Sequence, residues 1–168
     1  VNRFDAQGTI LYFSTSDAGV IATPVDEVAP EPFMTKWTEN TDENCVGCHV
    51  VSADGERMAY AWQPDATIEP RMGLADTSTG EPDALIEHAN STDWGKYSTI
   101  SPDGDFVVFS DDDELHFYDG RTGEYLSTLD SDLKLTMPDW ARDDSVLVAV
   151  SGVAHGDHAY GRSEIVAF

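Results

Sequence analysis

Five consecutive residues have the types and the spacing that could do chemistry. They are Cys45-Val46-Gly47-Cys48-His49, which match the C-x-x-C-H pattern of covalent haem attachment. Each thiol can bond to one vinyl group of a porphyrin, and the imidazole of His49 can then bind the iron. The chain contains no other cysteine. The sequence therefore predicts one covalent haem c, with His49 as the proximal iron ligand.

Other uses of the same residues stay open. A disulfide between Cys45 and Cys48, or a thioredoxin-like redox pair, would not require His49, and such redox motifs favour a βαβ context that the sequence lacks. A structural zinc site needs four ligands, so it would draw residues from elsewhere in the chain. A five-residue pattern can also occur by chance.

The charge balance excludes several classes of partner. The 168 residues include 32 acidic and nine basic side chains, which give a formal net charge of −23 at pH 7. Nucleic acids and anionic membranes would be repelled, so neither is expected as a partner. The acidic residues are spread through turns, which indicates a solvated surface or adaptation to a saline medium.

Two further features bear on location and metals. No apolar run has the length of a membrane span, so no membrane insertion is expected. Haem attachment of this kind is completed outside the cytoplasm, so we expect a periplasmic or extracellular protein whose signal peptide was removed or lies outside this sequence. The run Asp111–Glu114 suggests calcium but lacks the Gly and terminal Glu of an EF-hand loop, so calcium is left without support.

Short turn motifs recur at intervals of about 40 to 50 residues, a length typical of four-stranded propeller blades. Ser52-Ala53-Asp54-Gly55 returns as Ser101-Pro102-Asp103-Gly104, and Asp76-Thr77-Ser78-Thr79-Gly80 returns as Asp119-Gly120-Arg121-Thr122-Gly123. Asp-Gly between apolar stretches is also a hairpin signal. The motifs therefore predict repeated antiparallel sheets.

The strands follow from these turns. No segment has helical periodicity, and residues 29–44 are expected to form a long loop that leads into the haem motif. Strands are predicted at Arg57–Trp62, Arg71–Ala75, Ala84–Ile86, Phe106–Ser110, Leu115–Tyr118, Tyr125–Leu129, Val146–Ser151 and Glu164–Phe168. The prediction is an all-β protein, a single β-propeller-like domain over residues 1–168 with two complete and two partial blades. Since propellers close with about four to eight blades, this is a partial propeller or a fragment of a larger one, and further copies or chains are expected to complete the ring.

The Ser-x-Asp-Gly turns, with Met137-Pro138-Asp139-Trp140 before the next turn, resemble the repeats of TolB-type, WD40-like (PD40) β-propellers. A subset of that family carries C-x-x-C-H just before Ser-x-Asp-Gly, as in Cys48-His49-Val50-Val51-Ser52-Ala53-Asp54-Gly55. The resemblance covers about Cys45 to Ser151 and implies a propeller fold, but it says little about activity. The third turn departs from the pattern, because Ala141 replaces Ser and Asp143-Asp144 replaces Asp-Gly.

Counting back from the three turns places Cys48, Tyr97 and Met137 at one level of the innermost strands, which line the channel of a propeller. Met137 is therefore the first candidate for the sixth iron ligand, and it is equally explained as a core methionine. His155 and His158, in the Gly-rich loop after Ser151, are the alternative candidates.

Several other residues receive lesser roles. Trp94 and Tyr97 are expected to wall the haem, and Met34 is a weaker candidate ligand from the loop before the motif. His116 is most simply a strand-packing residue, and Trp140 is expected to pack between blades.

These features lead to an extracytoplasmic, mono-haem c-type cytochrome on a β-propeller scaffold that serves electron transfer and meets a redox partner protein. The alternatives are a binding or scaffold propeller in which haem is a structural staple, and a peroxidase-like haem enzyme with an open sixth position. No hydrolase, zinc-protease or phosphate-loop motif is present. An electron-transfer protein is therefore favoured over a catalyst.

Overall fold

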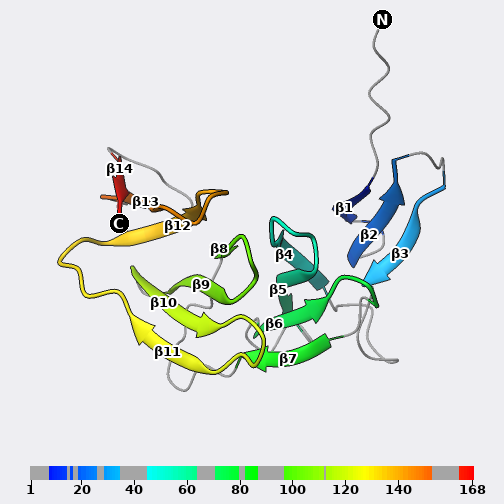
Figure 1. Ribbon diagram of the computed structural model, residues 1–168, viewed down its shortest axis with the longest axis horizontal. Helices are drawn as coiled ribbons and strands as arrows, with labels where there is room; N and C mark the ends of the chain where they lie inside the picture. Colours follow the sequence, from blue (N-terminus) through cyan, green and yellow to red (C-terminus); the bar gives the residue numbers. More distant parts are fainter. Residues whose placement is uncertain are drawn as a thin grey trace, which may run out of the picture.

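Four small antiparallel sheets make up the part of the chain that the computed structural model describes. The described residues are 8–14, 16, 19–25, 29–34, 45–63, 71–79, 82–86, 97–111, 113–152 and 163–168. Within them every regular element is a β-strand, which confirms the all-β prediction. The sheets follow one another around an open fan and do not form a closed ring (Figure 1).

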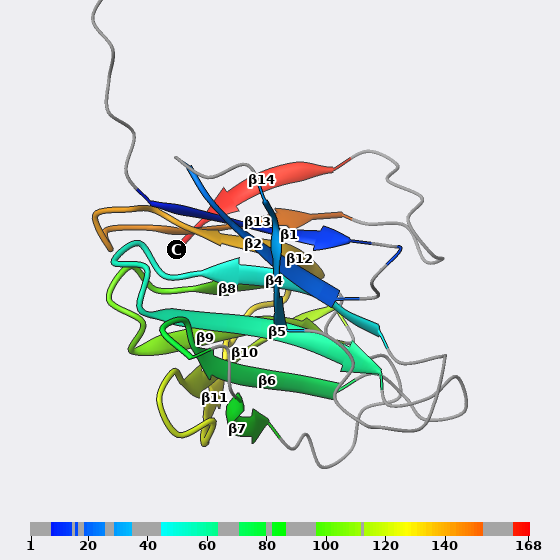
Figure 2. The ribbon, with the colours of Figure 1, turned by 90° about the vertical axis from the view of Figure 1, so that its right-hand side faces the viewer.

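The two middle sheets have four strands each. Sheet 2 contains β4 (Cys45–Val51), β5 (Arg57–Gln63), β6 (Arg71–Asp76) and β7 (Pro82–Ile86). Sheet 3 contains β8 (Tyr97–Ile100), β9 (Phe106–Asp111), β10 (Glu114–Asp119) and β11 (Tyr125–Thr128). In both sheets the strands pair in chain order, and Figure 2 shows this succession from β4 outward to β7.

The two end sheets have three strands each among the described residues. Sheet 1 contains β1 (Thr9–Ser14), β2 (Gly19–Pro24) and β3 (Glu31–Met34). Sheet 4 contains β12 (Leu135–Trp140), β13 (Leu147–Ser151) and β14 (Glu164–Ala167). The first strands of sheets 2, 3 and 4 lie along the inner side of the fan, where β8 is next to both β4 and β12 (Figure 1).

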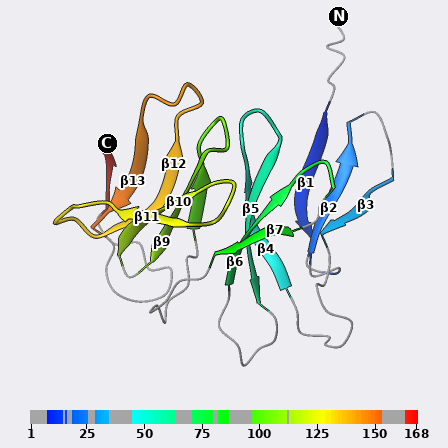
Figure 3. The ribbon, with the colours of Figure 1, turned by 60° about the horizontal axis from the view of Figure 1, so that its bottom comes forward.

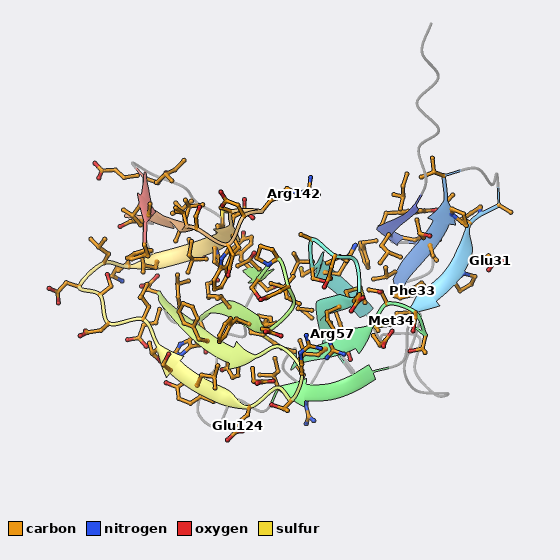
Figure 4. The ribbon with its side chains drawn as sticks, in the orientation of Figure 1. Glu31, Phe33, Met34, Arg57, Glu124 and Arg142 are labelled. Carbon is orange, nitrogen blue, oxygen red and sulfur yellow. The ribbon has the colours of Figure 1, made fainter. Side chains whose placement is uncertain are left out.

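The expectation of a loop over residues 29–44 was wrong at its start. Glu31–Met34 forms β3, which pairs with β2 through Val20 opposite Met34. Met34 is buried in the core between sheets 1 and 2, so it packs with apolar neighbours and is not a loop residue available to a haem (Figure 4). Pro32 hid the strand from sequence reasoning, since proline is tolerated in a strand mainly at an edge.

Each core cluster is shared by two neighbouring sheets. Sheets 1 and 2 bury Val20, Met34, Met58, Tyr60 and Ala75 between them. Sheets 2 and 3 bury Ala59, Met72, Leu74, Ile86, Ile100, Val107, Phe109 and Tyr118. Sheets 3 and 4 bury Val108, Leu115, Leu135, Leu147 and Ala149. A sheet therefore completes its core only when the next sheet covers it.

The Ser-x-Asp-Gly turns join the first two strands of their sheets, and these turns lie on one side of the fan (Figure 3). In sheet 3 the buried Ser101 hydroxyl accepts a hydrogen bond from the Phe106 N–H at 2.9 Å and donates one to Asp103 at 2.7 Å. Ser52, Asp54 and Arg57 repeat the arrangement in sheet 2. The motif is thus a side-chain network that closes each hairpin.

Arg57 also ties sheet 2 to sheet 3. Its Nη2 donates a hydrogen bond to the Gly120 carbonyl oxygen at 3.0 Å, in the turn between β10 and β11. The N–H of Asp54 reaches the Pro102 carbonyl oxygen at 3.3 Å, so the two Ser-x-Asp-Gly turns also touch directly. Figure 4 shows Arg57 at this junction of the two sheets.

Candidate functional site

The C-x-x-C-H motif lies in β4, and its last two residues form a β-bulge. Gly47 pairs with Ala61 and Val50 with Ala59, so Cys48 and His49 together stand opposite the single residue Tyr60. Cys48 has a φ of 46°, a left-handed conformation that is uncommon for any residue but glycine. Its side chain is exposed and forms no disulfide. The bulge therefore presents a free thiol at the inner edge of sheet 2.

His49 reaches from sheet 2 to sheet 1. Its Nε2 lies 3.4 Å from the carbonyl oxygen of Leu11 in β1, and its side chain is half-buried. Keeping this contact leaves Nδ1 as the ring nitrogen that could bind a metal, and a bond through Nε2 would require His49 to leave Leu11. This contact could not be predicted from the sequence, because 38 residues separate the two partners.

The types of donor group fit covalent haem attachment at the bulge. Cys48 is exposed there, and His49 follows it directly. An exposed thiol with an imidazole beside it then supplies the types of group that the attachment needs.

Met137 occupies the corresponding bulge of sheet 4. Thr136 pairs with Val150 and Asp139 with Val148, so Met137 and Pro138 oppose Ala149 as Cys48 and His49 oppose Tyr60. Met137 has a φ of 49°, close to that of Cys48. The two residues are thus structural equivalents on strands that both lie next to β8.

The expected level of Tyr97 needs a correction. Counting from the turns put Tyr97 beside Cys48, but β8 pairs one-to-one with β9, with Tyr97 opposite Ser110 and no bulge. By its pairing Tyr97 corresponds to Gly47 and not to Cys48, and a shift of one residue turns a side chain to the other face. A bulge depends on the partner strand, so counting along one strand could not reveal it.

Three of the predicted site residues lie outside the described residues. They are Trp94, His155 and His158. The predictions for them as haem wall or alternative ligands therefore stand as predictions.

Two other side chains take the places expected for them. Trp140 stacks on Phe106 at 6.3 Å between ring centroids and meets Phe117 edge-on, so it packs between sheets 4 and 3. His116 is buried in β10, and its Nδ1 lies 2.9 Å from the Thr128 hydroxyl of β11. Both residues therefore stabilise packing within the fan.

Aspartates in the turns are held in their charged form by hydrogen bonds. The N–H of Asp105 and then the hydroxyl of Ser101 lower the pKa of Asp103. The hydroxyls of Ser52 and Ser145 likewise lower the pKa of Asp54 and Asp143. In the described part of the chain, no group of three or more His, Cys, Asp or Glu side chains is placed to hold a metal ion. The carboxylates of Asp54, Asp103 and Asp143 therefore act within their turns.

Successive antiparallel sheets around a common inner side define a β-propeller arrangement, and solved structures share it. TolB from Acinetobacter baumannii superposes with a TM-score of 0.67 at 16% identity, over 95% of this chain and 37% of that one. A putative TolB from Agrobacterium tumefaciens gives a TM-score of 0.58 at 17% identity, over 80% and 46% of the two chains. A structure from a study of two prolyl endopeptidases gives a TM-score of 0.60 at 17% identity, over 88% of this chain and 24% of that one.

These likenesses show the fold. The chain spans less than half the length of each of these proteins. No protein-family model matches the sequence, and no curated protein matches it either. In the described ranges no helix is long and apolar enough to cross a membrane.

Proposed function

We propose that this chain carries the haem of an extracytoplasmic, mono-haem c-type cytochrome built on propeller sheets, and that it serves electron transfer. The observation that supports the proposal is the C-x-x-C-H motif on the inner strand of sheet 2, with Cys48 exposed in a bulge. When bound, haem supplies one-electron redox chemistry at its iron.

The residues have distinct roles in this proposal. Cys45 and Cys48 attach the porphyrin, and His49 is the proximal ligand. The Leu11 carbonyl oxygen, 3.4 Å from the His49 ring, is a ready acceptor for a ring N–H and would fix the orientation of the imidazole. Met137 is the first candidate for the sixth position, with His155 and His158 as its rivals. Since Met137 shares the bulge position of Cys48, its place on the inner side of sheet 4 is consistent with this role.

The first test is covalent attachment. The chain is produced together with a bacterial cytochrome c maturation system, and its intact mass is measured before and after acid–acetone extraction. We expect a mass increased by one haem that survives extraction, and no haem on the double variant Cys45→Ser/Cys48→Ser. A wild-type chain that keeps two free thiols, or that carries zinc, contradicts the proposal.

The second test concerns the iron ligands. His49→Ala should change the spin state seen in the optical spectrum, and His116→Gln, a buried imidazole remote from the motif, should leave it unchanged. Met137→Leu keeps the apolar volume and removes the sulfur, so it should lower the reduction potential if Met137 binds the iron. If the reduction potential of Met137→Leu is unchanged, and His155→Ala or His158→Ala gives high-spin iron, the sixth ligand is the corresponding histidine.

The same spectrum separates the two alternative functions. Low-spin, six-coordinate iron supports electron transfer. High-spin iron that binds small ligands supports a peroxidase-like enzyme with an open sixth position. A haem that exchanges electrons with no partner protein supports the remaining alternative, a binding scaffold in which the haem is a structural staple. The acidic surface fits a redox partner with a basic docking patch.

A further inference from the structure

Hydrogen bonds link three side chains in series at the outer edge of sheet 3. The hydroxyl oxygen of Tyr125 lies 2.9 Å from that of Thr128, which in turn lies 2.9 Å from Nδ1 of His116. A hydroxyl can accept one hydrogen bond while it donates another. Thr128 can therefore receive the phenolic proton of Tyr125 as it passes its own proton to the imidazole. The three groups form a path from a phenol to a base.

The strands β10 and β11 place these side chains on one face because their pairing is irregular. In β10, His116 and Tyr118 are two residues apart, so they share a face. Their partners in β11 are Thr128 and Tyr125, which are three residues apart, since the register skips Leu126. On a regular strand, residues three apart would point to opposite faces. The irregular pairing therefore allows the phenol and the threonine hydroxyl to meet.

A carboxylate favours His116 as the acceptor of the proton. Oε2 of Glu114 lies 3.8 Å from Nε2 of His116. The carboxylate favours a proton on Nε2, so Nδ1 faces Thr128 as the basic nitrogen. Burial of His116 opposes a positive charge on the ring, and the nearby carboxylate offsets part of that cost when Nδ1 takes up a proton. The imidazole is thus placed both to accept the proton and to hold it.

Tyr125 is the accessible member of a pair of aromatic rings. It is 51% exposed on β11, the outermost strand of sheet 3 (Figure 1). Its ring meets that of Tyr118 edge-on, at 5.7 Å between centroids, and Tyr118 is buried in the core shared by sheets 2 and 3. Burial raises the pKa of Tyr118, so this phenol keeps its proton. An oxidant at the surface therefore meets Tyr125 first, and Tyr125 has the path for its proton.

We propose that Tyr125 is a redox-active tyrosine that loses one electron to a strong one-electron oxidant, such as a metal complex of high potential. As the electron leaves, the O–H bond of Tyr125 breaks and its proton moves to Thr128, while the Thr128 proton moves to Nδ1 of His116. The products are a neutral tyrosyl radical, an imidazolium and the reduced oxidant, so atoms and charge balance. A reductant that refills the radical draws the proton back along the same path. This site lies outside the haem motif, and the inference does not depend on haem.

The test is oxidation of the purified chain by a flash-quench reaction. A laser pulse excites a ruthenium tris-bipyridine complex, and a cobalt(III) ammine takes one electron from it, which leaves ruthenium(III) as the oxidant. Transient absorption follows tyrosyl radical formation, and Tyr125→Phe identifies the part of the signal that belongs to Tyr125. We expect this part to form faster than the part lost in Tyr12→Phe. Tyr12 is the matched reference, because it is 39% exposed and its hydroxyl makes no hydrogen bond within the described part of the chain.

Two substitutions interrupt the proton path, and a third keeps it. Thr128→Val removes the hydroxyl at similar volume, and His116→Gln removes the imidazole. Each should slow radical formation at Tyr125 by about tenfold or more, whereas Thr128→Ser should keep the wild-type rate. In wild type the rate should not change with the concentration of buffer base, because the protein itself accepts the proton. In Thr128→Val the rate should rise with buffer base.

Circular dichroism checks that each variant keeps its sheets, and the buffer measurement on wild type needs no variant. The proposal is overturned if Tyr125 is oxidised no faster than Tyr12, or if the wild-type rate rises with buffer base as that of Thr128→Val does. Equal rates in wild type, Thr128→Ser and Thr128→Val also overturn it, because the hydrogen bonds then only hold β11 on β10.

Discussion

The residue at the last position distinguishes the turn at residues 141–144 from the Ser-x-Asp-Gly turns at 52–55 and 101–104, although all three turns have similar backbone conformations there. Gly55 and Gly104 adopt φ of 79° and 75°, which glycine reaches without steric cost, and Asp144 adopts 62° at the same position of its turn. Its N–H still donates to the Ala141 carbonyl oxygen, as that of Gly55 does to Ser52. The fold thus imposes the conformation although the sequence does not provide the preferred residue.

Asp144→Gly should therefore stabilise the protein. Relief of the left-handed strain outweighs the extra freedom of the unfolded glycine, and the expected gain is about 0.5–1 kcal/mol in the free energy of unfolding. Gly55→Ala is the reverse experiment, because open space surrounds that position and only the φ opposes a side chain. It should cost about 1 kcal/mol. Urea denaturation measures both, and a loss of stability in Asp144→Gly contradicts the assignment of strain.

The buried serine of the turn should be more costly to remove than the exposed one. Ser101→Ala leaves the Phe106 N–H without the hydroxyl that accepts its hydrogen bond, which should lower the free energy of unfolding by about 1–3 kcal/mol. Ser145 also donates to its turn aspartate, Asp143, but is exposed, so Ser145→Ala should cost less than about 0.5 kcal/mol. Equal losses in the two variants would show that burial is not the deciding factor.

At the scale of elements, the sequence predicted the strands that a turn motif precedes. Arg57–Gln63, Phe106–Asp111 and Leu147–Ser151 were each placed within a residue, because an Asp-Gly-type turn and the apolar run after it are neighbours in sequence. β3 and the two bulges were missed, since pairing with another strand creates them. The same holds for the candidate site. The motif Cys45–His49 could be recognised in the sequence, but the contact of His49 with Leu11 could not, because it joins two strands that are distant in the chain.

The aspartates of the Ser-x-Asp-Gly turns should make the free energy of unfolding decrease at acidic pH. Asp103 has its pKa lowered in the folded state by the Asp105 N–H and then by the Ser101 hydroxyl, whereas its unfolded pKa is about 3.9. The folded state therefore binds fewer protons, and the stabilisation by this carboxylate is present above about pH 4 and is lost as pH falls through the lowered pKa. Asp103→Asn keeps the hydrogen-bonding oxygen but cannot titrate.

The measurement is the difference in unfolding free energy between wild type and Asp103→Asn across pH. It should be largest near neutrality and shrink toward zero as the pH falls below about 4. Asp54→Asn, in the equivalent turn of sheet 2, should show the same trend, because its pKa is lowered by the Ser52 hydroxyl and the Glu56 N–H. A difference that stays constant down to strongly acidic pH would contradict the role given to these carboxylates.

At the scale of the whole molecule, packing and charge oppose each other. Neighbouring sheets share each core cluster, so stability accumulates from contacts between sheets as in other repeat proteins. Ion pairs offset little of the acidity: in the described part of the chain Arg121 pairs with Asp105 and Lys134 with Asp113, all on solvent-accessible side chains. The formal charge of −23 therefore acts as general repulsion within one small fan.

Salt should accordingly raise the thermal stability of the protein. Screening reduces the range of the repulsion from about 30 Å at roughly 0.01 M to about 3 Å at roughly 1 M, and the folded state gains more than the expanded unfolded chain because its charges lie closer together. A gain of about 2 kcal/mol would raise the midpoint of thermal unfolding by roughly 4–8 °C for a chain of this size. The midpoint is measured in NaCl and in KCl, so that an effect of one specific ion can be excluded. A midpoint that stays level or falls with salt would show that the packing between sheets, and not the acidity, limits stability.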